Sequence, residues 1–132
     1  MAGYSGKKLI DKLGVKENFK IKIINPPENY FELIETPKQL VITEKVSKAD
    51  FIHCFVKSVE ELNIHLPVLK NEIHKNGMIW ISWPKKSSKI PTDVNENLIR
   101  DCALEHGLVD VKVCAVDDTW SGLKLVYRLK DR

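Results

Sequence analysis

The sequence predicts a single-domain, Rossmann-like α/β fold over residues 1–132, with a mostly parallel sheet, helices on both faces and an antiparallel C-terminal hairpin strand. Three observations carry this prediction. Apolar, β-branched runs alternate with stretches of helical periodicity, which is the order typical of a parallel sheet. A length of 132 residues suits one core rather than two. Only a polar loop joins the last two β-rich runs, which indicates a hairpin.

A short helix and a strand are expected at the start of the chain. Residues 7–13 place apolar side chains on one helical stripe, and Gly14 suits the positive φ of a C-terminal cap. Residues 19–24 alternate apolar side chains with lysines and then become fully apolar, as in a strand that enters the core. The strand is expected to stop at Asn25-Pro26-Pro27.

The next segment is harder to place. Residues 28–35 are expected to form two helical turns that end before Pro37, because a residue that precedes proline avoids the helical region. Residues 40–43 and 51–56 are β-rich. Only residues 44–50 separate these two runs, which is too few for a parallel crossover. The two strands are therefore not expected to be neighbours, and the position of residues 40–43 in the sheet stays open.

A long helix and a buried strand form the predicted centre of the fold. Ser58 and Glu61 fit a capping box at a helix start. Pro67 lies inside the helical pattern and predicts a kink or a restart. Asn76-Gly77 is expected to close this helix and lead into the apolar run of residues 77–84, which proline ends.

A last helix and the hairpin complete the predicted order. Thr92 is expected to cap the helix, which ends at His106-Gly107. Residues 109–116 and 123–129 are the two β-rich runs of the hairpin. The apolar face of the helix is expected to consist of Val94, Leu98 and Cys102.

Composition narrows the classes of function. The formal charge of +3 comes from 21 basic and 18 acidic residues spread along the chain, so no specific nucleic-acid ligand is expected. No apolar run is long enough to span a bilayer, and no apolar targeting segment opens the chain. Cys54, Cys102 and Cys114 are widely spaced in apolar or periodic stretches, which is typical of buried, reduced thiols. A cytoplasmic protein without a membrane partner is expected.

Two resemblances add to this interpretation. From Asp50 onward the order of elements resembles the second half of the class I S-adenosylmethionine-dependent methyltransferase fold. Four stretches are similar to a small prokaryotic family known only as a domain of unknown function, which implies the same fold and a cytoplasmic setting but no activity. They are Met1-Ala-Gly-Tyr-Ser-Gly, Asn25-Pro-Pro-Glu-Asn-Tyr-Phe, Ser82-Trp-Pro-Lys-Lys and residues 108–125.

The methyltransferase resemblance implies a cofactor at a glycine-rich turn after the first strand. The turn here is Asn25-Pro26-Pro27-Glu28, which has no glycine. The acidic residue that would hold ribose hydroxyls after the second strand is Glu44. Asn25-Pro26-Pro27 followed by Tyr30 is similar to the Asn-Pro-Pro-Tyr signature of amino-group methyltransferases, but two residues are interposed and the motif follows the first strand.

Polar and aromatic residues follow the predicted parallel strands, where open α/β sheets bind their ligands. Lysines and exposed amides at a helix start suit a small anionic or nucleotide-like ligand, with aromatic rings as walls. The same residue types are also common in solvated loops and turns. The ten expected ligand-binding residues are Asn25, Tyr30, Lys57, Ser58, Trp83, Lys85, Lys86, Asp117, Asp118 and Trp120.

Three functions stay open from the sequence. The first is noncatalytic binding of a small anionic or nucleotide-like ligand. The second is protein interaction or self-association through an aromatic patch of Tyr30, Trp83 and Trp120. The third is S-adenosylmethionine-dependent methyl transfer. No cofactor, metal site or catalytic residue is predicted, because no metal-binding histidine spacing, nucleophile motif or phosphate-binding loop is present.

Overall fold

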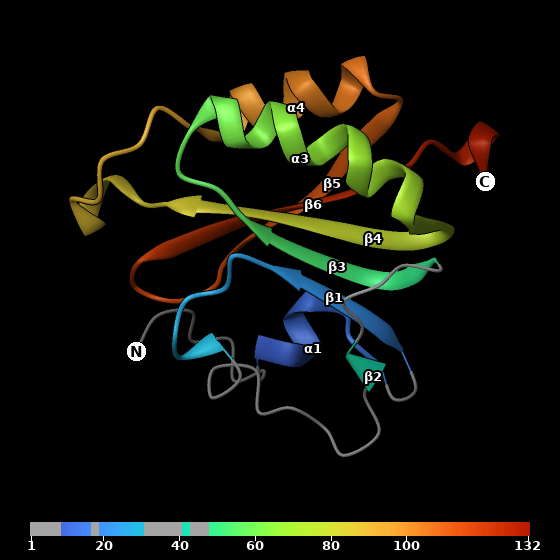
Figure 1. Cartoon of the computed structure of the whole chain (residues 1–132), viewed down its shortest axis with the longest axis horizontal. Coiled ribbons are helices and arrows are strands. Elements are labelled where there is room, and N and C mark those ends of the chain that lie inside the picture. Colours follow the sequence, from blue (N-terminus) through green and yellow to red (C-terminus); the bar gives the residue numbers. More distant parts are fainter. Residues whose placement is uncertain (1–8, 17–18, 31–40, 43–47) are drawn as a thin grey trace.

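The computed structural model describes residues 9–16, 19–30, 41–42 and 48–132 (Figure 1). Its helices are α1 (Leu9–Leu13), α3 (Val59–Glu72) and α4 (Glu96–Glu105), with short 3₁₀ turns at Lys86–Ser88 and Leu129–Asp131. Its strands are β1 (Lys20–Ile24), β2 (Val41–Ile42), β3 (Ala49–Phe55), β4 (Ile73–Pro84), β5 (Leu108–Ala115) and β6 (Trp120–Tyr127).

The described strands form one sheet in the order β2-β1-β3-β4-β6-β5. The first four strands in this order are parallel, whereas β6 runs antiparallel to β4 and β5 antiparallel to β6. The predicted α/β fold with an antiparallel C-terminal hairpin is therefore confirmed. Since β1 lies between β2 and β3, the prediction that these two strands are not neighbours is also confirmed. Leu40 and Thr43 lie outside the described residues.

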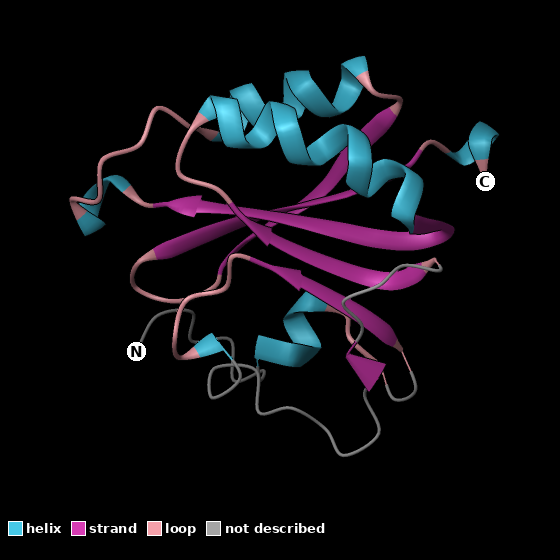
Figure 2. Cartoon of the chain, viewed as in Figure 1, coloured by secondary structure: helices cyan, strands magenta, loops and turns pink. Residues whose placement is uncertain are grey.

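Helices cover both faces of the sheet, with α3 and α4 on one face and α1 on the other (Figures 1 and 2). Each face has its own apolar cluster because successive strand side chains point to opposite faces. In β3, Ile52 and Cys54 belong to the cluster beneath α3 and α4, whereas Phe51 and Phe55 belong to the cluster on the α1 face. The α1 face is further tied to the sheet by the indole N–H of Trp80, which donates to the Leu13 carbonyl.

The junction between α3 and β4 differs from its prediction. Asn76-Gly77 does not close the helix, because α3 ends at Glu72 and both residues lie inside β4. Gly77 is needed for close packing instead. A Cβ on Gly77 would lie 2.8 Å from Ile73 Cγ1 and 2.9 Å from the Asp50 carbonyl oxygen. This approach occurs where the pairing of β3 with β4 shifts register.

The long helix begins as predicted and continues past its proline. Ser58 Oγ accepts from the Glu61 amide at 3.1 Å, which confirms the predicted serine cap. The Glu61 carboxylate accepts from the Lys57 amide at 2.9 Å, one residue before the amide that a strict capping box engages. A restart at Pro67 is wrong, since the proline lies inside the single helix α3. Leucines on both sides of it are buried against the sheet, and this tertiary packing outweighs the low helix propensity of proline.

The start of α4 lies three residues later than predicted. Asn95 caps it by accepting from the Leu98 amide at 3.0 Å, whereas the Thr92 hydroxyl donates to the Lys57 carbonyl at 2.7 Å. The predicted apolar face shifts accordingly. Val94 is buried ahead of the helix and Leu98 is 37% exposed. The buried residues of the helix are Ile99, Cys102 and Ala103.

The remaining elements follow their predictions where the structure describes them. Gly14 and Gly107 have φ of 85° and 80° after α1 and α4, as expected for C-terminal caps. The predicted helix over residues 28–35 lies mostly outside the described residues. The hairpin is present, although β6 begins earlier than expected, at Trp120. No helix in the described part of the chain is long and apolar enough to cross a membrane.

Replacement of Gly77 tests the close packing between β3 and β4. Gly77→Ala is expected to lower the free energy of unfolding by about 1–3 kcal/mol, because the new Cβ overlaps a backbone oxygen that cannot move cheaply. Urea denaturation measures the change. Lys75→Ala, at an exposed position of the same strand, is the control and should stay within about 0.5 kcal/mol of the parent. An unchanged stability of Gly77→Ala would contradict the packing described here.

Candidate functional site

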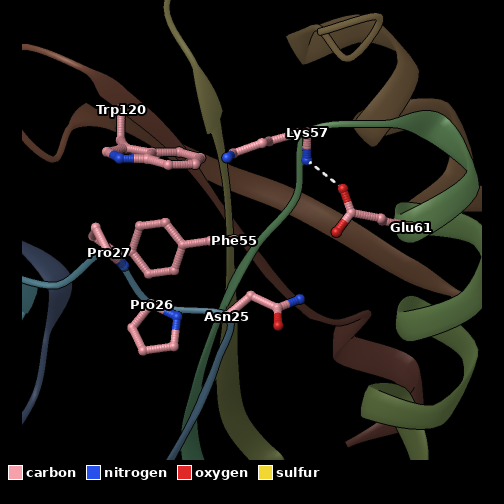
Figure 3. A pocket seen from close by; sticks show the side chains of 7 residues that line it. All are labelled: Asn25, Pro26, Pro27, Phe55, Lys57, Glu61 and Trp120. Carbon is pink, nitrogen blue, oxygen red and sulfur yellow. Dashed lines mark hydrogen bonds between the residues drawn. The ribbon is translucent and has the colours of Figure 1, made fainter. Parts of the chain in front are cut away.

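A cavity of about 280 Å³ opens at the carboxyl edge of the sheet (Figure 3). It lies beside the turn after β1, the end of β3, the first turn of α3 and the start of β6. This is the edge where open α/β sheets collect ligands. Its lining residues are Asn25, Pro26, Pro27, Phe55, Lys57, Glu61 and Trp120.

Two aromatic rings form the apolar wall of the cavity. Phe55 and Trp120 meet edge to face with ring centroids 5.0 Å apart. Both are buried, with exposed fractions of 2% for Phe55 and 7% for Trp120. Figure 3 shows Pro27 beside the Phe55 ring. Asn25 adopts φ of 55°, a left-handed conformation that asparagine tolerates, and this bend directs the two prolines across the end of β3.

The polar groups of the cavity are Lys57, Glu61 and the Asn25 carboxamide. The Glu61 carboxylate faces the backbone of Lys57, where it accepts the amide proton, and the lysine ammonium extends toward Trp120 (Figure 3). Within the described residues Lys57 has no carboxylate within ion-pair distance. Its exposed positive charge is therefore available to an anionic group in the cavity.

The structure brings three of the ten predicted residues into this cavity, namely Asn25, Lys57 and Trp120. Ser58 serves as the N-cap of α3. The ten predicted residues did not include the other four that line the cavity, which are Pro26, Pro27, Phe55 and Glu61. Glu61 was already visible as the partner in the predicted capping box, and a residue one turn into a helix lies close to the strand end that precedes it. Phe55 gave no signal beyond its place in an apolar strand.

Trp83 and Lys86 lie elsewhere, so the predicted ten-residue cluster is wrong in this respect. Trp83 packs beneath α3 and α4, whereas Trp120 packs on the opposite face of the sheet. Trp83 and Lys86 line a separate depression of about 240 Å³ near the start of α4. Lys85 contributes its amide, which donates to the Thr119 carbonyl at 2.8 Å and closes the end of the hairpin.

The two aspartates of the hairpin loop have different settings. Asp117 Oδ1 accepts from the amides of Thr119 and Trp120, both at 2.8 Å, and so forms a side-chain turn. Asp118 is exposed. The Asp117 turn positions Trp120 at the cavity, whereas Asp117 itself does not line it.

Tyr30 belongs to a buried polar chain and not to the cavity wall. Its hydroxyl lies 2.8 Å from His53 Nδ1, and His53 Nε2 lies 2.7 Å from Ser82 Oγ. All three side chains are fully buried. The His53 ring stacks on Phe55 with centroids 4.3 Å apart, so this chain supports the cavity floor. Burial lowers the pKa of His53 to about 3, so the imidazole is neutral at pH 7.

The predicted aromatic interaction patch is wrong. Tyr30 is 0% exposed, Trp83 8% and Trp120 7%, so these rings offer little surface to a partner protein. The prediction for the cysteines is confirmed for Cys54 and Cys102, which are buried free thiols, while Cys114 is half-buried. Burial, with a smaller contribution from Glu61, raises the pKa of Cys54 to about 12.

Neither a protein-family model nor a curated protein matches the chain. Solved structures do match. A ribosomal protein L11 methylase from Lactobacillus delbrueckii subsp. bulgaricus has a TM-score of 0.57 at 12% identity, covering 91% of this chain and 75% of the other. Magnesium protoporphyrin IX methyltransferase from Synechocystis PCC 6803, with bound S-adenosylmethionine, has a TM-score of 0.60 at 11% identity, covering 91% and 74%.

A third match is fibrillarin from Aeropyrum pernix with natively bound S-adenosylmethionine, at a TM-score of 0.56 and 11% identity over 89% of this chain and 73% of the other. The chain has a methyltransferase-like fold. Identity at this level speaks for the fold alone, and the predicted resemblance in element order is confirmed. The cavity lies beside the turn after β1, where the methyltransferase resemblance implies the cofactor, while Glu44 lies outside the described residues.

Acid titration tests the buried histidine. His53 has its usual pKa of 6.5 when unfolded and about 3 when folded, so between these values the unfolded state binds a proton that the native state excludes. Stability should therefore fall as the pH drops below about 6.5, by about 1.4 kcal/mol per pH unit at most. Urea denaturation between pH 7 and pH 4 measures it. His53→Gln should lose this component, and an identical pH dependence in both proteins would contradict the assignment.

Proposed function

We propose that the protein binds an adenosyl or other nucleotide-like ligand in the cavity between Lys57 and Trp120. The observation that carries the proposal is the meeting of an exposed ammonium, a carboxamide and two aromatic rings at the carboxyl ends of β1 and β3. Structural neighbours with S-adenosylmethionine or S-adenosylhomocysteine bound support it, since they share the fold in which this edge holds a ligand.

The chemistry of the cavity suits the parts of such a ligand. The Lys57 ammonium attracts a carboxylate or phosphate, and the Trp120 and Phe55 rings provide an apolar wall for a base or a methylene chain. The Asn25 carboxamide offers a donor and an acceptor. A volume of about 280 Å³ lies just below the range of roughly 300–1,000 Å³ usual for small-molecule sites, so one end of the ligand would extend over the exposed Pro26.

The prolines of the turn set a condition on this binding. A glycine-rich turn lets the backbone approach a ligand and offers its amides, whereas Pro26 and Pro27 have no amide proton to donate. The ligand is therefore held by side chains, with Lys57 as the charged contact. Affinity should depend on ionic strength because this charge is exposed.

Isothermal titration with S-adenosylmethionine and S-adenosylhomocysteine tests the proposal. The unmodified protein should bind one or both saturably. Lys57→Met should weaken binding about tenfold or more, because a charge-assisted contact contributes roughly 1.5–3 kcal/mol. Lys86→Met, in the separate depression beside Trp83, is the matched control and should bind normally. Absence of binding to the unmodified protein, or equal binding by Lys57→Met, would overturn the proposal.

Methyl transfer is the second candidate function. It is favoured over a purely noncatalytic role by the neighbours, since the structures described above are named as methylases or methyltransferases or hold S-adenosylmethionine. The cavity contains one carboxylate, Glu61, but it already accepts from the Lys57 amide. Incubation with S-adenosylmethionine carrying a labelled methyl group, together with a cell extract, tests this candidate. Label transfer that the Lys57→Met variant loses would support it, and absence of transfer despite binding leaves the noncatalytic role.

A further inference from the structure

A second cavity lies near the opposite end of β4, on the α1 face of the sheet. It has a volume of about 240 Å³ and is formed by the early part of β4, the later part of β6 and a residue of β5. It shares no lining residue with the cavity at Lys57 and Trp120. The residues that line it are Asn76, Gly77, Met78, Val111, Lys124, Val126 and Arg132.

The charged side chains that line this second cavity are all basic. Lys124 and Arg132 line it, no aspartate or glutamate does, and Lys112 lies close enough to Lys124 to repel it. Burial lowers the pKa of Lys124, and repulsion from Lys112 and Arg132 lowers it further. Within the described residues none of these three cations has a carboxylate within ion-pair distance.

Several cations elsewhere in the chain do have a partner. Lys22 pairs with Glu72 at 2.7 Å, Arg100 with Asp110 at 3.0 Å, and Arg128 with Asp131 at 3.0 Å. A half-buried lysine without a counter-charge is costly, because the low-dielectric surroundings strengthen repulsion and remove water. An anion in the cavity would supply the missing negative charge.

Two of the three cations are held in place by backbone carbonyls. Lys112 Nζ donates to the Lys12 carbonyl at the end of α1 at 3.0 Å, and Arg132 Nε donates to the Tyr127 carbonyl at 2.9 Å. Lys124 Nζ lies 4.0 Å from the point where a Cβ on Gly14 would stand. Lys112 is thus engaged by the end of α1, while Lys124 and the remaining guanidinium nitrogens of Arg132 have donors that a ligand could use.

We propose that this cavity binds a phosphate-type anion through Lys124 and Arg132, with the Asn76 carboxamide as a neutral donor. Arginine suits phosphate because its planar group presents parallel donors, and lysine adds a compact point charge. The cavity is large enough for one or two phosphate groups. Free pyrophosphate and the diphosphate of a nucleotide share this chemistry, and the proposal does not depend on ligand binding at Lys57.

Titration with inorganic pyrophosphate tests the proposal, at an ionic strength held constant with sodium chloride. The unmodified protein should bind pyrophosphate saturably and gain thermal stability by mass action. Lys124→Met should weaken binding about tenfold or more, as expected when one charged contact is lost. Equal affinity for pyrophosphate and ADP would identify the phosphates as the whole recognised unit, whereas tighter ADP binding would identify a nucleotide as the ligand.

Two matched variants distinguish binding in this cavity from binding at the first cavity and from a general effect of positive charge. Lys130→Met removes an exposed lysine outside the cavity, and Lys57→Met removes the lysine of the first cavity, so both should bind pyrophosphate normally. Lys124→Met should also be at least as stable as the parent without anion at low salt, because it removes a repelled, half-buried cation. Unchanged pyrophosphate binding by Lys124→Met, or an equal loss in Lys130→Met, would overturn the proposal.

Discussion

The parallel pairing of β3 with β4 is the constraint on which both faces of the structure depend. The buried stretches of these strands, residues 51–55 and 79–84, are covered on both sides, so each side chain there must be apolar or find a polar partner within the core. Alternate residues satisfy this separately on the two faces. On the α1 face, His53 and Ser82 meet across the two strands and join Tyr30, while the other face carries the leucines of α3. Close approach of the strands at Gly77 completes the arrangement.

The order of the helices and strands could be predicted from the sequence, whereas several of their first and last residues could not. The alternation of β-rich and helical stretches correctly predicted the parallel part of the sheet, because hydrophobic periodicity reflects burial that the whole fold requires. Local end signals were less reliable. Asn76-Gly77 resembles a helix stop but permits a close contact inside β4, and Thr92 resembles a cap but binds the Lys57 carbonyl. A small or hydroxylated residue serves turns, caps and close packing alike, so only tertiary contacts distinguish these uses.

The sequence predicted at which edge of the sheet the candidate site lies, but not on which face of the sheet each side chain lies. Strand order placed Asn25, Lys57 and Trp120 at the carboxyl end of the sheet, and the structure brings them together. Trp83 lies at the same edge, but its side chain is on the opposite face of the sheet. Pro84 pairs with Trp120 and shares its face, so Trp83, one residue earlier, is on the other face. A change of one residue in register reverses the face of every side chain. No pattern within a single strand specifies that register.

The chain has a methyltransferase-like sheet but prolines where the resemblance implies a glycine-rich turn. In the proposed site, ligand contacts would therefore come from side chains instead of backbone amides. Backbone amides recognise a ligand by fixed geometry, whereas in the proposed site the exposed Lys57 ammonium would recognise it mainly by charge. Binding held by such a charge weakens as salt screens it, while aromatic contact with Trp120 is largely insensitive to salt. The salt dependence of affinity for an adenosyl ligand therefore reports which of these two groups holds it. A steep dependence is expected if the Lys57 ammonium contacts the carboxylate of the ligand, and a flat one would contradict that role for Lys57.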